Sequence, residues 1–331
     1  MRELAATETE KHSGWWATIL LSLSLLLAAC ASTAPAPAPA PRLFDFHSNF
    51  WLNLHHFARA AGRGLPTPAE LTADERAVWD KGVAFYREQY SERNLWFDDG
   101  LVRIKEALRV LDEDAPLDGA GLDRDLKAIL TEMAPIYRAH WWPAHDAANR
   151  AWIASVEPLL RAHGARLSRR VAAAYGVAWP STPIPVDLSV SAGPNGAYTT
   201  TRPGTHVTIA ASDPRYQGLE ALEMVFHESS HAWGSRIRQA IEQAEAARHK
   251  TVPPQLWHAV LFYNAGELTR RTLAEDGVPG YVEHAIVHEV YPALCGEGCR
   301  DRVVAAWNPH LAGTTSIEQA LDGLVAAWPA S

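Results

Sequence analysis

The residues with the clearest chemical meaning are His227, Glu228 and His231, in the sequence H-E-S-S-H. On a helix, two histidines four positions apart lie one above the other, so both imidazoles can reach one metal ion. The glutamate beside the first histidine projects about 100° further round the helix, next to such an ion rather than onto it. A carboxylate there can take a proton from a water molecule that the ion has made more acidic. The motif therefore predicts a zinc site that activates water, with Glu228 as the general base.

The motif needs a helix to position it, and residues 219–248 predict one. Apolar residues recur at helical spacing through this segment, at Leu222, Val225, Phe226, Trp233, Ile237 and Ile241. Asp213-Pro214 upstream offers a cap and a first-turn proline. This context favours a metal site over the alternative, a surface helix that carries two histidines by accident.

Zinc in a hydrolytic site usually takes three protein ligands and leaves a fourth position for water. Ile237 stands where the metzincin pattern H-E-x-x-H-x-x-G-x-x-H needs its last histidine, which excludes that family. A second helix is predicted over residues 256–275, and Glu267 lies on its apolar stripe. A buried carboxylate is costly unless it is paired or bound to metal. Glu267 is therefore the predicted third ligand, and a salt bridge to Arg270 or Arg271 is the alternative.

Other histidines and glutamates follow the motif. His258 precedes Glu267 by nine residues, which is about half a turn round the helix, so its side chain is predicted to point elsewhere. The reserve ligands are Glu283, His284, His288 and Glu289.

Between residues 184 and 212 the apolar period changes to two, which is typical of strands. The segment predicts a small antiparallel sheet directly before the metal helix. An outer strand beside the site can pair its backbone with an extended peptide, although an ordinary structural sheet explains the pattern equally well.

The chain before this sheet is predicted to be mostly helical. The expected helices cover residues 44–61, 72–90, 96–111, 122–140 and 145–175. Together these patterns predict an α+β fold that is predominantly α-helical, in which a small antiparallel β-sheet precedes a zinc-binding helix pair.

Residues 184–291 resemble the gluzincins, zinc metallopeptidases in which H-E-x-x-H on one helix is completed by a glutamate on a later helix. The resemblance implies His227, His231 and Glu267 as Zn²⁺ ligands and Glu228 as the base that acts on a peptide or protein substrate. It also implies a donor that steadies the oxyanion, for which the candidates are Tyr281 and His284. The sequence N-A-G-E around Glu267 departs from the thermolysin and aminopeptidase motifs, so the substrate class stays open. The competing hypothesis is a zinc-binding envelope lipoprotein or scaffold without catalysis.

The first residues predict export. An apolar run from Trp15 ends in Leu27-Ala28-Ala29-Cys30, which resembles the lipobox of bacterial lipoprotein signal peptides. That resemblance implies cleavage before Cys30, a lipid anchor on its sulfur and a place on the periplasmic side of the envelope. Ala31 after the cysteine favours the outer membrane, by resemblance to Gram-negative sorting patterns. An uncleaved signal anchor is the alternative, although the run is short for a spanning helix, which needs roughly 20 residues.

Charge and cysteine content indicate which partners and which cellular compartment to expect. A net charge of −8 gives no reason to expect a nucleic-acid partner. Cys295 and Cys299 can form a disulfide in an oxidising compartment. The predicted organisation is a signal peptide (residues 1–29), a Pro/Ala-rich tether (30–42), a helical region (43–180) and a metallopeptidase-like region with C-terminal helices (181–331).

Overall fold

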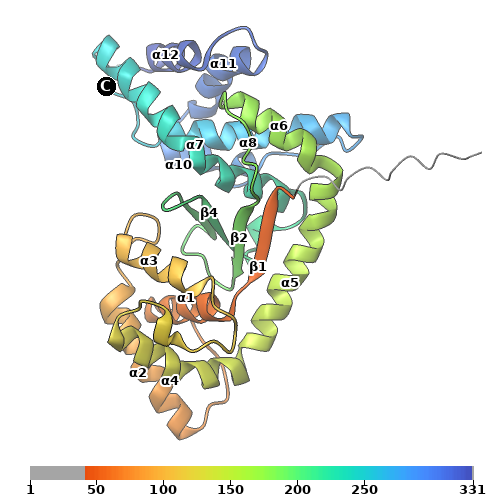
Figure 1. Cartoon of the computed structure of the whole chain (residues 1–331). Coiled ribbons are helices and arrows are strands. Elements are labelled where there is room, and N and C mark those ends of the chain that lie inside the picture. The colour runs from red at the N-terminus through yellow and green to blue at the C-terminus, as the bar shows by residue number, and fades with distance from the viewer. Residues whose placement is uncertain (1–41, 330–331) are drawn as a thin grey trace, which may run out of the picture. The chain divides into compact units, whose positions relative to one another are not determined.

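The computed structural model describes residues 42–329 of the chain. The predicted signal peptide, the lipid anchor at Cys30 and nearly all of the predicted tether lie outside the described residues. The fold is α+β and mainly helical, as the sequence predicts, with one small sheet (Figure 1).

The sheet contains β1 (Phe44–Ser48), β2 (Ile184–Ser189), β4 (His206–Ala210) and β3 (Ala197–Thr200), in that spatial order. It is a mixed sheet, because β1 pairs with β2 and β2 pairs with β4 in parallel, whereas β3 pairs with β4 antiparallel. The prediction of an antiparallel sheet therefore holds only for the β3–β4 pair.

Strand β1 corrects the helix predicted over residues 44–61. Phe44 and Phe46 alternate with Asp45 and His47, and Phe44 lies opposite Ile184 in the parallel pairing. Pairing with a distant segment gives this short alternating stretch its strand conformation. The helix α1 (Phe50–Gly62) begins only after Asn49, whose side chain accepts a hydrogen bond of 2.8 Å from the Leu52 amide.

One group of helices covers one end of the sheet (Figure 1). It contains α1, α2 (Ala73–Tyr90), α3 (Asp99–Leu108) and α4 (Arg124–His140). A capping box begins α2 at the start of the predicted range 72–90, because Thr72 and Glu75 exchange both of its hydrogen bonds. Aromatic side chains dominate the core of this group: Phe50, Phe57, Trp79, Tyr86, Tyr137, Trp141 and Trp142.

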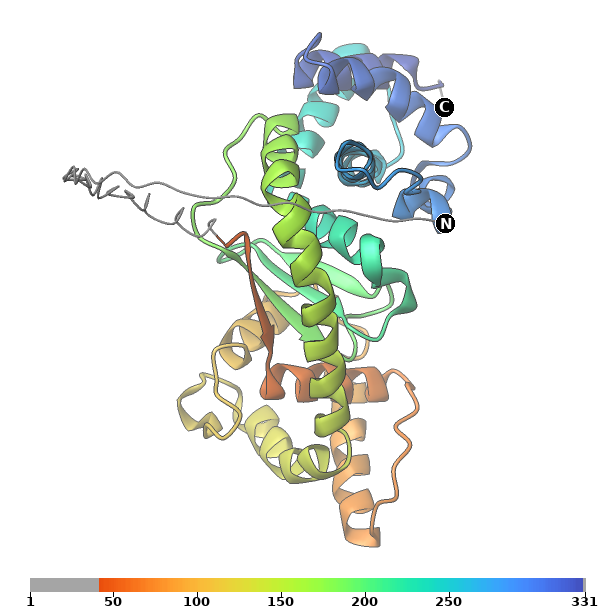
Figure 2. The ribbon, with the colours of Figure 1, turned by 90° about the vertical axis from the view of Figure 1, so that its right-hand side faces the viewer.

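A long helical stretch connects this group to the rest of the molecule. Helix α5 (Trp142–Leu159) runs past the sheet, packs against β1 and β2, and continues through a π-helical turn into α6 (Ala165–Ala174), as Figure 2 shows. Trp152 on α5 donates a hydrogen bond of 2.6 Å to the Tyr216 carbonyl, just before the helix predicted over residues 219–248. Helix α5 therefore holds the sheet and the start of that helix in one packed unit.

The second helical group contains the predicted metal helices. Its members are α7 (Gly218–Arg248), α8 (Leu256–Glu275), α9 (His284–Val287), α10 (Val290–Cys295), α11 (Cys299–Leu311) and α12 (Ile317–Ala327). Helices α7 and α8 pack against each other, and the bounds of both agree closely with the predicted ranges. The sulfur atoms of Cys295 and Cys299 are bonded, which joins the end of α10 to the start of α11.

The boundary predicted between residues 180 and 181 falls between strands of one sheet, since β1 lies before it and the other three strands lie after it. Within residues 42–329, no helix combines the length and the apolar character needed to cross a membrane.

Candidate metal centre

His227 and His231 lie on α7, where their four-residue spacing brings both rings to one face. Their ring centroids are 5.2 Å apart, and the His227 side chain is buried. The two serines of the motif are turned back onto the helix: Ser229 and Ser230 donate hydrogen bonds of 2.6 and 2.7 Å to the carbonyls of Val225 and Phe226. The prediction that the motif lies on a helix is confirmed.

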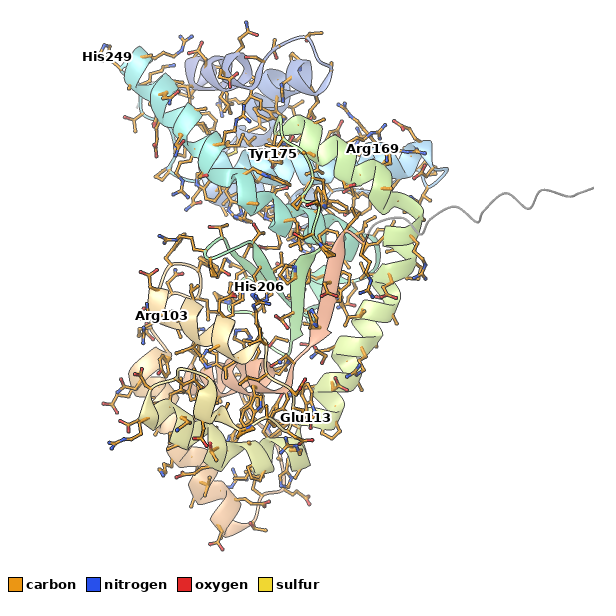
Figure 3. All side chains as sticks on the ribbon, viewed as in Figure 1. Arg103, Glu113, Arg169, Tyr175, His206 and His249 are labelled. Atoms are coloured by element: carbon orange, nitrogen blue, oxygen red, sulfur yellow. A yellow bond between two sulfur atoms is a disulfide. The ribbon has the colours of Figure 1, made fainter. Side chains whose placement is uncertain are left out.

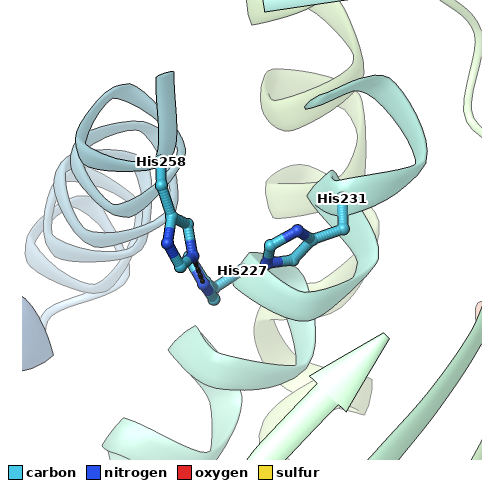
Figure 4. A group of neighbouring side chains, drawn as sticks. All are labelled: His227, His231 and His258. Carbon is cyan, nitrogen blue, oxygen red and sulfur yellow. Dashed lines mark hydrogen bonds between the residues drawn. The ribbon is translucent and has the colours of Figure 1, made fainter. Parts of the chain in front are cut away.

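The third residue of this group is His258, from the first turn of α8. Its Nε2 lies 3.3 Å from Nε2 of His227, and its ring centroid lies 5.0 Å from that of His231. One ring nitrogen from each of the three side chains falls within 4.8 Å of the others. The three imidazoles converge from α7 and α8 (Figure 4), so this group could hold a metal ion.

Glu267 does not join the histidines, which corrects the predicted ligand set. Its carboxylate accepts two hydrogen bonds of 2.8 Å from the Arg270 guanidinium and one of 2.6 Å from Nε of Arg271. The apolar stripe was a weak guide here, because every residue of α8 from Ala259 to Thr269 is buried. The salt bridge to Arg270 and Arg271, weighed as the alternative, is what the structure contains.

Burial keeps the three imidazoles uncharged. It lowers the pKa of His231 to about 4 and that of His258 to about 3. Burial also lowers the pKa of His227 well below its usual value, and repulsion from His231 and His258 adds to this shift. Neutral imidazole is the form that binds metal ions, so the three residues fit a divalent cation.

Glu228 faces the same cavity as the histidines and is almost fully buried. The Thr199 hydroxyl, on strand β3, donates a hydrogen bond of 2.6 Å to its carboxylate. Burial raises the pKa of Glu228 to about 7, although the Thr199 hydrogen bond and the charge of Lys105 oppose this rise. A carboxyl with a pKa near neutrality can both accept and return a proton.

The cavity has a volume of about 1150 Å³. Its walls include His227, His231 and His258, the carboxylate of Glu228 and all four residues of β3. In the described sheet β3 is an outer strand, because it pairs only with β4. The arrangement therefore places three metal-binding nitrogens, a carboxylate and a strand edge around one space.

The two predicted oxyanion donors are differently placed. The Tyr281 hydroxyl donates a hydrogen bond of 2.6 Å to the buried carboxylate of Glu223, and Tyr281 does not line this cavity. His284 does line it, but Nδ1 of His284 lies 2.7 Å from Oε2 of Glu220. Among residues 42–329, neither side chain belongs to the group of three histidines that could hold a metal ion.

A buried polar network behind β3 was missed in the sequence. The Lys105 ammonium donates hydrogen bonds to the Thr200 hydroxyl (3.2 Å) and to the His206 carbonyl (3.0 Å). The His206 ring, labelled in Figure 3, lies between Asp187 (2.5 Å) and Glu106 (3.0 Å). Burial lowers the pKa of Lys105 to about 7. Because side chains alternate along a strand, this network and the Thr199 hydroxyl lie on opposite faces of β3.

Comparison of the chain with models of protein families, with curated proteins and with solved structures returned no match.

Proposed function

We propose that this protein is a zinc-dependent peptidase in which His227, His231 and His258 hold the metal and Glu228 is the general base. The observation that carries the proposal is the convergence of three neutral imidazoles beside a buried carboxylate in one cavity. Three histidines are one of the donor sets of catalytic zinc, and they leave a coordination position for water.

Zinc in this site would acidify a water molecule and polarise the carbonyl of the scissile bond. Glu228 takes a proton from the attacking water and later returns it to the leaving amine. The Thr199 hydrogen bond fixes the direction of the carboxylate, and burial keeps its proton affinity close to what neutral pH requires. Each of these roles belongs to a side chain that the fold already holds in place.

The position of β3 supports a peptide as the substrate. An outer strand offers unpaired backbone groups that an extended peptide can bind by adding a strand to the sheet. Thr199, in the middle of β3, hydrogen bonds to Glu228, so a peptide paired with this strand passes beside the general base. All four residues of β3 line the cavity, so a peptide that pairs with this strand can extend over several residues.

The proposal extends to location. The lipobox-like sequence ending in Cys30 supports export and a lipid anchor on the periplasmic side of the envelope, with the outer membrane favoured by Ala31. Cys30→Ser should then accumulate as the unprocessed precursor. An intact Met1 in the membrane-extracted wild type, measured by mass spectrometry, would show that the apolar run is an anchor instead.

The catalytic proposal is tested by Glu228→Gln, because an amide cannot accept the proton. We expect the variant to keep the metal and to lose cleavage of a broad peptide library. Glu242→Gln is the matched control, since Glu242 is an exposed glutamate on the same helix that lines the same cavity. If the metal-loaded wild type cleaves nothing in the library, the site belongs to the competing class, a protein that binds the metal without catalysis.

A further inference from the structure

A second group of side chains that could hold a metal ion lies beside the first turn of α7, where Glu220 shares a helix face with His227. Nδ1 of His284 is 2.7 Å from Oε2 of Glu220, and Nε2 of His288 is 2.8 Å from the same oxygen. One ligand atom from each of the three residues falls within 4.8 Å of the others. Two imidazoles and a carboxylate thus converge on one point.

The local sequence repeats the geometry of the first centre. His284 and His288 are four residues apart across the short helix α9, as His227 and His231 are on α7. Their ring centroids lie 4.4 Å apart. Glu289, the next residue, has a left-handed backbone with a φ of 51°, which turns the chain sharply after the second histidine.

The surroundings of this group favour a cation. His284 is buried, and Tyr216 stacks on its ring with centroids 5.4 Å apart. Among residues 42–329, no lysine or arginine forms a salt bridge with Glu220, and Arg215 near the group is bound by both oxygens of Asp213. A carboxylate that meets only two imidazoles leaves room for a metal ion to supply the positive charge.

This group is separate from the three-histidine centre. Glu220 precedes His227 by seven residues, so the two side chains share a face of α7 about 10 Å apart along the helix. The Phe262 ring stacks on both groups, with centroid distances of 3.8 Å to His227 and 6.2 Å to His284. Paired catalytic metals lie about 4 Å apart, so a cation held here would act by itself.

We infer that Glu220, His284 and His288 form a second site for a divalent cation of the zinc type, which fastens α9 to the first turns of α7. Imidazole nitrogen and carboxylate oxygen are both ligands that zinc accepts, and three protein ligands leave one position of a tetrahedral site open. His284 and His288 line the cavity, so that open position faces the same space as the first centre.

The inference is tested by metal binding, which does not depend on whether the protein cleaves peptides. The full chain is purified in detergent, stripped with a chelator and titrated with Zn²⁺, with bound metal measured by mass spectrometry. We expect two equivalents in the wild type, one in His288→Asn and one in Glu220→Gln. His231→Asn, which disables only the first centre, should also retain one.

A matched control is His140→Asn, because His140 is also hydrogen bonded to a glutamate, Glu75, at 3.0 Å but has no third ligand beside it. It should bind two equivalents. Circular dichroism identifies any variant that fails to fold. If His288→Asn does not fold, Glu220→Gln alone tests the site. The inference is overturned if His288→Asn and Glu220→Gln each bind as much metal as the wild type, whereas a wild type that loses its only equivalent in these two variants but keeps it in His231→Asn contradicts the first centre alone.

Discussion

His227 and His258 are separated by 31 positions in the chain, yet their Nε2 atoms lie 3.3 Å apart. The contact exists because α7 and α8 pack against each other, so that the first turn of α8 meets α7 at His227 and His231. His258 on α8, and not the motif alone, therefore completes the group that could hold a metal ion.

The first prediction concerns the ligand set. His258→Asn should lower Zn²⁺ affinity strongly, because a catalytic zinc site with two remaining protein ligands is incomplete. Glu267→Gln should leave the affinity within a factor of about two, since removing a group outside the ligand set leaves the donor atoms unchanged. Isothermal titration of stripped protein measures both. Reversed results would restore Glu267 as the third ligand.

The second prediction concerns Thr199. In Thr199→Val the Glu228 carboxylate loses a hydrogen bond of 2.6 Å from a hydroxyl, and hydrogen bonds to charged groups contribute about 1.5–3 kcal/mol. We expect kcat to fall by at least about tenfold while KM and metal content change little. Thr199→Ser keeps the hydroxyl and should recover most of the rate. Equal rates for the valine and serine variants would show that the hydroxyl has no part in positioning Glu228.

The third prediction concerns the buried Lys105. Its pKa falls from 10.5 in the unfolded chain to about 7 in the fold, mainly through burial, so between these values the unfolded state binds more protons. The free energy of unfolding should therefore rise with pH from 7 to 9, by at most about 1.4 kcal/mol per pH unit from this group. In Lys105→Met this contribution disappears. Urea unfolding at several pH values gives the free energy of unfolding of the wild type and of Lys105→Met. If this free energy depends on pH in the same way in both proteins, the lowered pKa of Lys105 is wrong.

The fourth prediction concerns the close approach of α8 to the segment before α9. A Cβ atom at Gly266 would lie 2.8 Å from Cβ of Glu283 and 3.2 Å from Oε1 of Glu223. Gly266→Ala should therefore destabilise the protein by about 1–3 kcal/mol, the usual cost of overpacking. Gly323→Ala is the control, because Gly323 is an exposed helical residue with open space around it, and this change should stabilise α12 by up to about 1 kcal/mol. The free energy of unfolding is measured for both variants. Changes of the same sign in the two variants would show that overpacking does not explain the effect at Gly266.

The parts of this structure that local sequence patterns determine were predictable. The bounds of α7 and α8, the capping box at Thr72 and the helical setting of His227 and His231 all depend on residues within a few turns. The strand β1 was not, because five residues with two phenylalanines fit a helical stripe as well as an alternating one. Its partner strand lies about 140 positions further along the chain, and only that pairing decides between the two.

The prediction that the His258 side chain points elsewhere was wrong for a related reason, since this side chain lies with His227 and His231. His258 and Glu267 lie about half a turn apart on α8, so only one of them can share a face with the metal ligands, and the apolar stripe pointed to Glu267. Helix α8 is buried on all sides through its middle, so burial there selects no direction. Which turn of α8 meets His227 depends on how the two helices pack, and a single sequence holds no local signal for that.

Strand β1 also determines how the molecule responds to a pull on its N-terminal end. The chain enters the described body directly through β1, which lies at the edge of the sheet opposite to β3. Because β1 runs parallel to β2, a force directed out along β1 loads their hydrogen bonds together in shear instead of opening them one after another. Strand β1 also touches the motif helix directly, because the Phe44 ring packs edge-on against Phe226, the residue before His227, with ring centroids 5.3 Å apart, so a load that enters through β1 is passed to the histidine-bearing turn of α7 without crossing the other strands.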